Sequence, residues 1–180
     1  MNRKTLFFNL ELLVDIMRMP LSEASNSIKL LAVVGLLISP WFFTQIGIAI
    51  LAPDEKIETM PSCEDDSGNC AHLGGGETYR MESSMATLIE VNSTMVWDKL
   101  LDYIEDNNGK ILVESASEYS YYVHFVEKTS FWKFPDDIVI SITDTTDSCV
   151  IEMHSHSRLG KGDIGVNPDR LNMIHDALIN

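Results

Sequence analysis

The sequence has no internal repeat, few cysteines and few basic residues. The last two shortages each exclude a class of protein. Three cysteines in 180 residues cannot build a four-cysteine zinc framework, and they allow at most one disulfide within the chain. The 13 lysine and arginine residues are outnumbered by 27 aspartates and glutamates. Binding a nucleic-acid backbone requires clustered positive charge, so we expect no nucleic-acid partner.

Charge is also distributed unevenly along the chain. Residues 1–53 carry four basic and three acidic groups, a net charge of +1, whereas residues 54–180 carry nine basic and 24 acidic groups, a net charge of −15. The second part therefore has the composition of an acidic, soluble domain. Because 45% of all residues are hydrophobic, the composition excludes a disordered chain.

The longest uncharged run lies between Lys29 and Asp54. Its 24 residues, LLAVVGLLISPWFFTQIGIAILAP, are nearly all apolar, and about 20 such residues suffice for a helix to cross a bilayer. We predict one transmembrane helix over residues 28–53, kinked at Pro40. The alternative is a cleaved signal peptide, whose apolar core spans only about 7–15 residues before a small-residue cleavage site. The longer run favours an uncleaved anchor.

The charges that flank this run predict its orientation. All four basic residues of the first part precede it, and the acidic residues Asp54, Glu55 and Glu58 follow it. The positive-inside rule places the N-terminus in the cytoplasm, stroma or matrix. We therefore expect a single-pass membrane protein whose acidic domain lies in a periplasm or a lumen.

Residues 1–27 form a separate amphipathic segment. Lys4, Glu11, Asp15 and Arg18 follow one another at intervals of 7, 4 and 3, so on a helix they share one stripe, with apolar residues on the remaining surface. This pattern is typical of a helix that lies at the membrane surface or packs on a partner. A targeting presequence is the alternative, although such peptides are poor in acidic residues.

The rest of the chain predicts an α+β domain. Residues 54–78 have the composition of an acidic linker that contains glycines and two cysteines, and residues 79–180 form the soluble domain. Strand patterns lie near residues 88–91 and over 110–115, 119–127, 138–143 and 149–158. Helical patterns cover 94–107, with Asn92 or Ser93 as the cap, and the residues after Pro168. We expect an antiparallel sheet of about five strands with two helices on one face.

The sequence HSHSRLGKGDIGVN at residues 154–167 resembles the signature of the domain-of-unknown-function family numbered 1499, R-S-x-S-R-x-G-x-x-D-x-G-x-N. The resemblance covers about residues 61–180, and the FPDD sequence at 134–137 and the pair Cys63 and Cys70 match two further elements of the family. His154 stands where the family usually has arginine. The cysteine box has six intervening residues instead of five, and Gly68 replaces its proline. The resemblance implies membrane-associated or exported proteins of bacteria and photosynthetic eukaryotes, with no established catalytic activity.

His154 and His156 are the candidate metal ligands. They alternate with Glu152 and Arg158 along one face of a predicted strand, and two histidines at i and i+2 can bind one metal ion. We favour a solvent-facing polar surface in which these histidines pair with carboxylates. We therefore expect neither a tightly bound metal nor a cofactor.

The glycine-rich loop contains the candidate contact residues. Basic groups are scarce in this domain, so Arg158, Lys161 and Arg170, together with His156, are candidates for contact with an anion or a partner. The spacing is not that of a P-loop. For the remaining motif residues we expect structural roles, including an Arg158–Asp163 ion pair and a helix cap; these residues are Asp136, Asp137, Gly160, Asp163, Gly165 and Asn167.

Cys63 and Cys70 are predicted to form a disulfide. They lie in a Gly- and Asp-rich stretch just outside the predicted span, with six residues between them, and an oxidising compartment there lets the bond persist. In the chain-entropy model so short a loop contributes about 2 kcal/mol. The alternatives are two reduced thiols, or a metal-binding pair completed by His72. Cys149, in a predicted strand, is the unpaired cysteine.

No set of catalytic residues stands out, so we do not favour an enzyme. We expect an accessory or docking subunit of a larger membrane protein assembly, respiratory or photosynthetic. The alternative is an extracytoplasmic module that binds a small ligand or a metal. A weaker alternative is a hydrolase of envelope substrates that uses Asp136 or Asp137 for acid–base chemistry.

Overall fold

The computed structural model describes residues 25–179. The predicted amphipathic segment, residues 1–27, therefore lies almost entirely outside the described residues. The chain divides into two compact units, residues 1–44 and residues 45–180, and each is described by itself.

Helix α2 (Asn26–Leu51) corresponds to the predicted transmembrane span and contains Pro40. It is long and apolar enough to cross a membrane, a criterion of length and composition that an anchor and a signal sequence both meet. Its aliphatic and aromatic side chains are largely exposed in the described chain, as expected of a helix that has no protein core around it.

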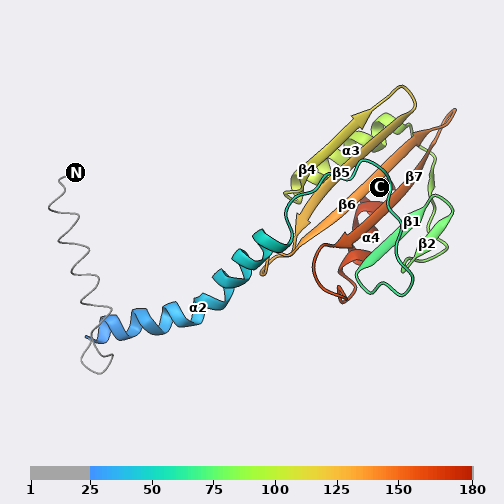
Figure 1. The fold of residues 1–180 in the computed structure, drawn as a ribbon. Helices are drawn as coiled ribbons and strands as arrows, with labels where there is room; N and C mark the ends of the chain where they lie inside the picture. Colours follow the sequence, from blue (N-terminus) through green and yellow to red (C-terminus); the bar gives the residue numbers. More distant parts are fainter. Residues whose placement is uncertain (1–24, 180) are drawn as a thin grey trace, which may run out of the picture. The chain divides into compact units, whose positions relative to one another are not determined.

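The second unit is built on one antiparallel sheet (Figure 1). Its strand order is β2-β1-β7-β6-β5-β4, with β3 also paired to β7. The strands are β1 (Cys70–Gly74), β2 (Glu77–Tyr79), β3 (Leu88–Ile89), β4 (Lys110–Ala116), β5 (Ser120–Lys128), β6 (Pro135–Asp144) and β7 (Cys149–Ser157). The predicted α+β class and antiparallel pairing are confirmed, and the sheet has seven strands instead of about five.

The two additional strands, β1 and β2, fall almost entirely in residues 54–78, which the sequence led us to interpret as a linker. All five residues of β1 are buried, and β1 pairs with β7. Gly74, Gly75 and Gly76 have positive φ values and form the turn into β2, which the absence of a side chain permits. A Cβ atom on Gly74 would lie 2.7 Å from the Ile151 carbonyl oxygen. The folded domain therefore begins before residue 79.

Two helices cover one face of the sheet (Figure 1). These are α3 (Ser93–Asp106) and α4 (Val166–Ile179). The predicted cap of α3 is present, because the Asn92 Oδ1 atom accepts a hydrogen bond from the Thr94 amide at 2.8 Å. The apolar faces of both helices meet the sheet in one core, which includes Val96, Leu100, Ile104, Ile138, Ile140, Ile142, Ile151, Leu171, Ile174 and Leu178.

The opposite face of the sheet is crossed by residues 53–63, which we call the covering segment (Figure 1). Its Ile57 amide donates to His124 Nδ1 at 3.1 Å, and its Ile57 carbonyl accepts from the Tyr122 hydroxyl at 2.9 Å. Cys63, at its end, forms the predicted disulfide with Cys70. The covering segment therefore shields polar side chains of the sheet that the sequence suggested were exposed.

We predict that Ile140→Ala lowers the free energy of unfolding by about 2–5 kcal/mol, because it leaves a cavity in a fully buried site. The matched control is Ile164→Ala, which alters a fully exposed side chain and should change stability by less than about 0.5 kcal/mol. Urea unfolding of the chain in mild detergent measures both values. Equal effects of the two substitutions would contradict the packing described above.

Candidate functional site

Asp136 and Asp137 are consecutive residues of β6, so their side chains lie on opposite faces of the sheet. Both are buried, and each carboxylate is neutralised by an arginine from the C-terminal part of the chain. Asp136 pairs with Arg170 at 2.7 Å on the helix-covered face, and Asp137 pairs with Arg158 at 2.6 Å on the other face.

On the helix-covered face, Arg170 is the centre of a closed network. Its guanidinium donates to Glu127 at 2.9 Å, to Asp136 at 2.7 Å and to the Asn167 side-chain oxygen at 3.1 Å. Arg170 is only 4% exposed, so it cannot present its charge to an anion or a partner as the sequence suggested. Glu127 was not expected in this network, because its partner lies 43 residues away in sequence.

On the other face, Asp137 accepts two hydrogen bonds from Arg158, at 2.6 and 2.7 Å, and one from His124 at 2.7 Å. Burial alone would raise the pKa of Asp137, but the hydrogen bonds from Arg158 and His124 outweigh it and lower the pKa to about 2. His124 receives the Ile57 amide on Nδ1, so its proton lies on Nε2, which faces Asp137.

Arg158 also fastens the covering segment to the sheet. Its Nη1 atom donates to the Pro53 carbonyl at 2.9 Å and to the Asp54 carboxylate at 2.8 Å. Lys110 holds the other oxygen of Asp54 at 2.6 Å. Hydrogen bonds from Lys110 and Arg158 lower the pKa of Asp54. The guanidinium of Arg158 is therefore engaged by protein groups, and its side chain is 8% exposed.

The prediction that Arg158 pairs with Asp163 is wrong. Asp163 instead pairs with Arg80 at 2.6 Å, and its carboxylate accepts the amides of Gly165 and Asn167. It therefore satisfies donors at the start of α4, the role we expected of Asn167. No sequence signal pointed to Arg80, which adopts a positive φ of 55° and also donates to the Gly68 and Cys70 carbonyls.

Asn167 is completely buried and joins three parts of the chain. Its side-chain oxygen accepts from the Ser155 hydroxyl at 2.6 Å, and its nitrogen donates to the Asn69 carbonyl at 2.8 Å. Gly160 and Gly165 have positive φ values of 96° and 88°, as the turns of this loop require. Lys161 is exposed and is the basic residue of the loop that faces solvent.

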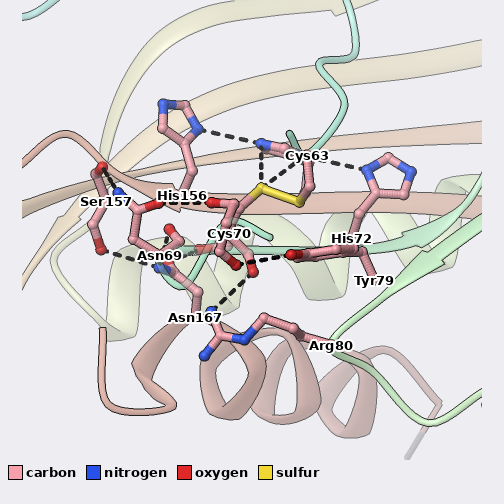
Figure 2. Close-up of a disulfide and its surroundings, with 12 residues drawn as sticks. Cys63, Asn69, Cys70, His72, Tyr79, Arg80, His156, Ser157 and Asn167 are labelled. Carbon is pink, nitrogen blue, oxygen red and sulfur yellow. Dashed lines mark hydrogen bonds between the residues drawn. A yellow bond between two sulfur atoms is a disulfide. The ribbon is translucent and has the colours of Figure 1, made fainter. Parts of the chain in front are cut away.

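A cluster of histidines and cysteines lies where β1 and β7 pair. The register places Cys70 opposite His156, and His72 opposite His154. Figure 2 shows His72 and His156 on either side of the Cys63–Cys70 disulfide. We expected a solvent-facing surface for His154, yet His72 is 2% and His154 is 1% exposed. The covering segment and the added strand β1 account for this difference.

The atoms of this cluster lie close together. His154 Nδ1 lies 3.2 Å from His72 Nδ1, and His154 Nε2 lies 3.3 Å from His156 Nδ1. The Cys70 sulfur lies 3.6 Å from His154 Nε2. Burial, followed by the neighbouring His156 and His72, lowers the pKa of His154 to about 3. Burial also lowers the pKa of His156. Neutral imidazoles with available lone pairs are the form that binds metal ions.

The structure brings together candidate metal ligands that the sequence suggested as two separate sets. Cys63, Cys70 and His154 have ligand atoms that all lie within 4.8 Å of one another. The Asp136/Asp137 pair, which the sequence left open for acid–base chemistry, is instead held by two arginines on opposite faces. The two carboxylates therefore do not face a common substrate.

A second feature is an apolar groove beside the glycine-rich loop. It has a volume of about 390 Å³ and lies between the β5–β6 turn and the loop that precedes α4; its lining includes Trp132, Phe134, Leu159, Ile164 and Val166. Ile164 is fully exposed, and Trp132 is 40% exposed. Because these apolar side chains are exposed on an acidic domain, the groove is a candidate surface for contact with a partner.

We predict that Asp137 makes folding sensitive to acid. Its pKa falls from 3.8 to about 2 on folding, so its contribution of about 2 kcal/mol is present above pH 4 and is lost as the pH falls through 2. In Asp137→Asn, Arg158 and His124 lose their buried partner, which costs about 3 kcal/mol at pH 7, and stability should fall less on acidification. Urea unfolding at several pH values measures this.

The control is Asp98→Asn, because Asp98 is exposed on α3. This variant should have the stability and the acid response of the unchanged chain. Parallel pH profiles for the unchanged chain and Asp137→Asn would contradict the role given to the Asp137–Arg158 pair.

Comparison with known proteins agrees with the resemblance noted in the sequence. No curated protein matches the chain. Among solved structures, the vertebrate conserved region (VCR) of human METTL16 is similar to part of it, with 9% sequence identity and a TM-score of 0.38, over 51% of this chain and 92% of that chain. The family model described as "Protein of unknown function (DUF1499)" matches residues 58–178. This match covers the sheet, the covering segment from Glu58 onward and both helices that pack on the sheet, and the chain therefore belongs to the DUF1499 family.

Proposed function

We propose that this protein is a membrane-anchored accessory subunit whose acidic domain docks on a larger membrane protein assembly. The observation that carries the proposal is the position of the apolar groove and its rim. They lie beside residues 45–53, where the chain enters the second unit, so a membrane span that ends at these residues keeps them close to the membrane surface.

Hydrogen bonds fix this position within the second unit. The Gln45 side chain, in the last turns of α2, donates to the Trp132 carbonyl at 2.8 Å. Arg158, at the start of the glycine-rich loop, binds the Pro53 carbonyl just after α2 ends. Both sides of the groove are therefore tied to the residues at which the helix meets the domain.

The exposed side chains at this end favour a protein partner. Trp132 and Ile164 line the groove and are 40% and fully exposed, so the groove can accept an apolar side chain. Contact with anionic headgroups is disfavoured, because residues 54–180 carry a net charge of −15, nine basic against 24 acidic groups. A neighbouring membrane-protein subunit agrees with both observations, because it can fill the apolar groove and requires no contact with anionic headgroups.

The disulfide and the flanking charges support an extracytoplasmic domain. Disulfides persist in oxidising compartments such as a periplasm, and the Cys63–Cys70 bond joins the end of the covering segment to β1. The basic residues before α2 and the acidic residues after it indicate the same orientation. An energy-transducing membrane, respiratory or photosynthetic, is the setting we propose.

A second candidate function is metal binding. This function is favoured by the cluster of His72, His154 and His156 beside the disulfide. The cluster is separate from the groove.

We predict that protease added to the cytoplasmic side of sealed membranes spares residues 60–180, because the domain lies across the bilayer. Immunoblotting with antibodies against the domain measures the protected fragment, and membranes permeabilised with detergent are the control in which it should disappear. Complete digestion of the domain in sealed membranes would show the opposite orientation.

We predict that Ile164→Glu releases the chain from its assembly. Burying such a side chain contributes about 1.5–3 kcal/mol, so the change should weaken association by about tenfold or more. Native electrophoresis in mild detergent should show the chain in a large complex, and Ile164→Glu as the free chain. Leu88→Glu is the matched control, since Leu88 is 51% exposed on β3 and pairs with the first residues of β7, away from the groove.

Photo-crosslinking from position 164 in intact membranes identifies the occupant of the groove. Adducts with another membrane protein, absent when the crosslinker is at position 88, support the proposal. Adducts with lipid alone, or equal migration of both variants and the unchanged chain, overturn it.

A further inference from the structure

We propose that Cys63, Cys70, His154 and His156 form a zinc(II) site that exists only when the Cys63–Cys70 disulfide is reduced. The cluster then converts a change of redox state into the uptake or release of a metal ion. The proposal gives a specific form to the metal-binding candidate, and it does not depend on docking through the groove.

Three of the four ligands already lie close together: the Cys63 and Cys70 sulfurs and a His154 ring nitrogen are all within 4.8 Å of one another, and His156 completes a tetrahedral site by a shift of its ring. Zinc binds sulfur at about 2.3 Å and imidazole nitrogen at about 2.0–2.1 Å, with tetrahedral angles in structural sites. These values place a sulfur and a nitrogen ligand about 3.5 Å apart, and two nitrogen ligands about 3.3 Å apart. The corresponding distances here are 3.6 Å for Cys70 Sγ and His154 Nε2, and 3.3 Å for His154 Nε2 and His156 Nδ1.

The proton arrangement leaves a lone pair on His154 Nε2. On one side, Glu152 lies 3.4 Å from His72 Nε2 and favours a proton on that nitrogen. His72 Nδ1 is then an acceptor, so the His154 Nδ1 atom at 3.2 Å carries the proton that it donates. His154 Nε2 is left with a lone pair directed toward His156.

His156 supplies the proton on the other side of the cluster. Its Nδ1–H donates to the lone pair of His154 Nε2 at 3.3 Å. A zinc ion between the two nitrogens takes the place of that proton, and Asp137, which lies 3.6 Å from His156 Nε2, supports a proton on that outer nitrogen when the metal is bound. Carboxylates that accept from the outer nitrogen of a ligating histidine, directly or through a second group, are the usual support of a zinc site.

The oxidation state of the cysteines decides whether the site is complete. The thiolate is the metal ligand, and a disulfide offers none. A dithiol reductant supplies two electrons and two protons, becomes a disulfide itself, and leaves two thiols at Cys63 and Cys70. Zinc(II) then replaces the two thiol protons, which are released to solvent, and is bound by two thiolates and two neutral imidazoles.

The fold holds some of these ligands more firmly than others, and this difference suits a site that forms on reduction of the disulfide. Cys70 and His154 are buried in neighbouring strands of the sheet, so their positions are fixed. Cys63 is half-buried at the end of the covering segment, outside any strand. An attacking thiolate can therefore reach Cys63, and after reduction its side chain can adjust around the metal while the sheet stays unchanged.

Cobalt(II), a spectroscopic substitute for zinc(II), tests the proposal with the full chain in mild detergent. The chain is divided into an oxidised sample and a sample reduced with a phosphine, and non-reducing peptide mapping verifies each state. The reduced chain should bind one cobalt(II) per molecule, with thiolate-to-cobalt charge-transfer absorption and tetrahedral d–d bands that zinc(II) abolishes. The oxidised chain should show neither.

Variants assign the ligands. Cys63→Ser and Cys70→Ser should each reduce the thiolate absorption, and His154→Ala and His156→Ala should each weaken binding at least tenfold. Glu152→Gln should weaken binding less, since it acts through His72. Cys149→Ser and His175→Gln are the matched controls, because Cys149 is a buried free cysteine and His175 bonds to the Ala86 carbonyl. Both should bind cobalt(II) as the unchanged chain does.

Two results overturn the proposal. One is a reduced chain that binds no cobalt(II) while its near-UV circular dichroism shows that it is folded. The other is equal cobalt(II) binding by the oxidised chain or by the Cys63→Ser/Cys70→Ser double variant. Because His156 is half-buried, His156→Gln provides a variant that keeps the fold and still tests the ligand. Native electrophoresis of the same samples reports on docking separately, so failure of one proposal is distinguishable from failure of the other.

Discussion

Two adjacent aspartates in the middle of the sheet require positive charge on both of its faces, and much of the structure follows from meeting that requirement. A carboxylate buried without a partner costs several kcal/mol. Asp136 and Asp137 point in opposite directions from β6, so one arginine cannot serve both. The chain provides Arg170 from α4 for one face and Arg158 from the end of β7 for the other. Each arginine in turn positions a different part of the molecule.

Arg170 ties α4 to the sheet through Asp136 and Glu127, whereas Arg158 ties the covering segment to the opposite face through Asp54 and the Pro53 carbonyl. The covering segment is what buries the histidine cluster and brings Cys63 to Cys70. The ion pairs on β6, the disulfide and the groove beside the glycine-rich loop thus belong to one connected arrangement, although the proposed docking and metal-binding roles use different parts of it.

The sequence predicted what depends on neighbouring residues and missed what depends on distant ones. The apolar spacing of α3, its Asn92 cap and the alternation along β5, β6 and β7 are local patterns, and the structure contains them. The strand β1 has only five residues and ends in glycine, so its identity depends on pairing with β7. The partners of Arg158 and Asp163 were missed for the same reason, because Asp54 and Arg80 lie 104 and 83 residues away.

The place of β1 in the sheet has a consequence for the order in which the domain is made. If the residues after α2 cross the membrane in chain order, β1 crosses early, yet its neighbour on the inner side is β7, whose His154 lies opposite His72 across a separation of 82 residues. Contacts so distant in sequence form late and slowly. Cys63 and Cys70 are only seven residues apart in sequence, so in that order of translocation they can meet before β7 has crossed. The covalent loop is then an early product of biogenesis, onto which the rest of the sheet assembles once its last strand has arrived.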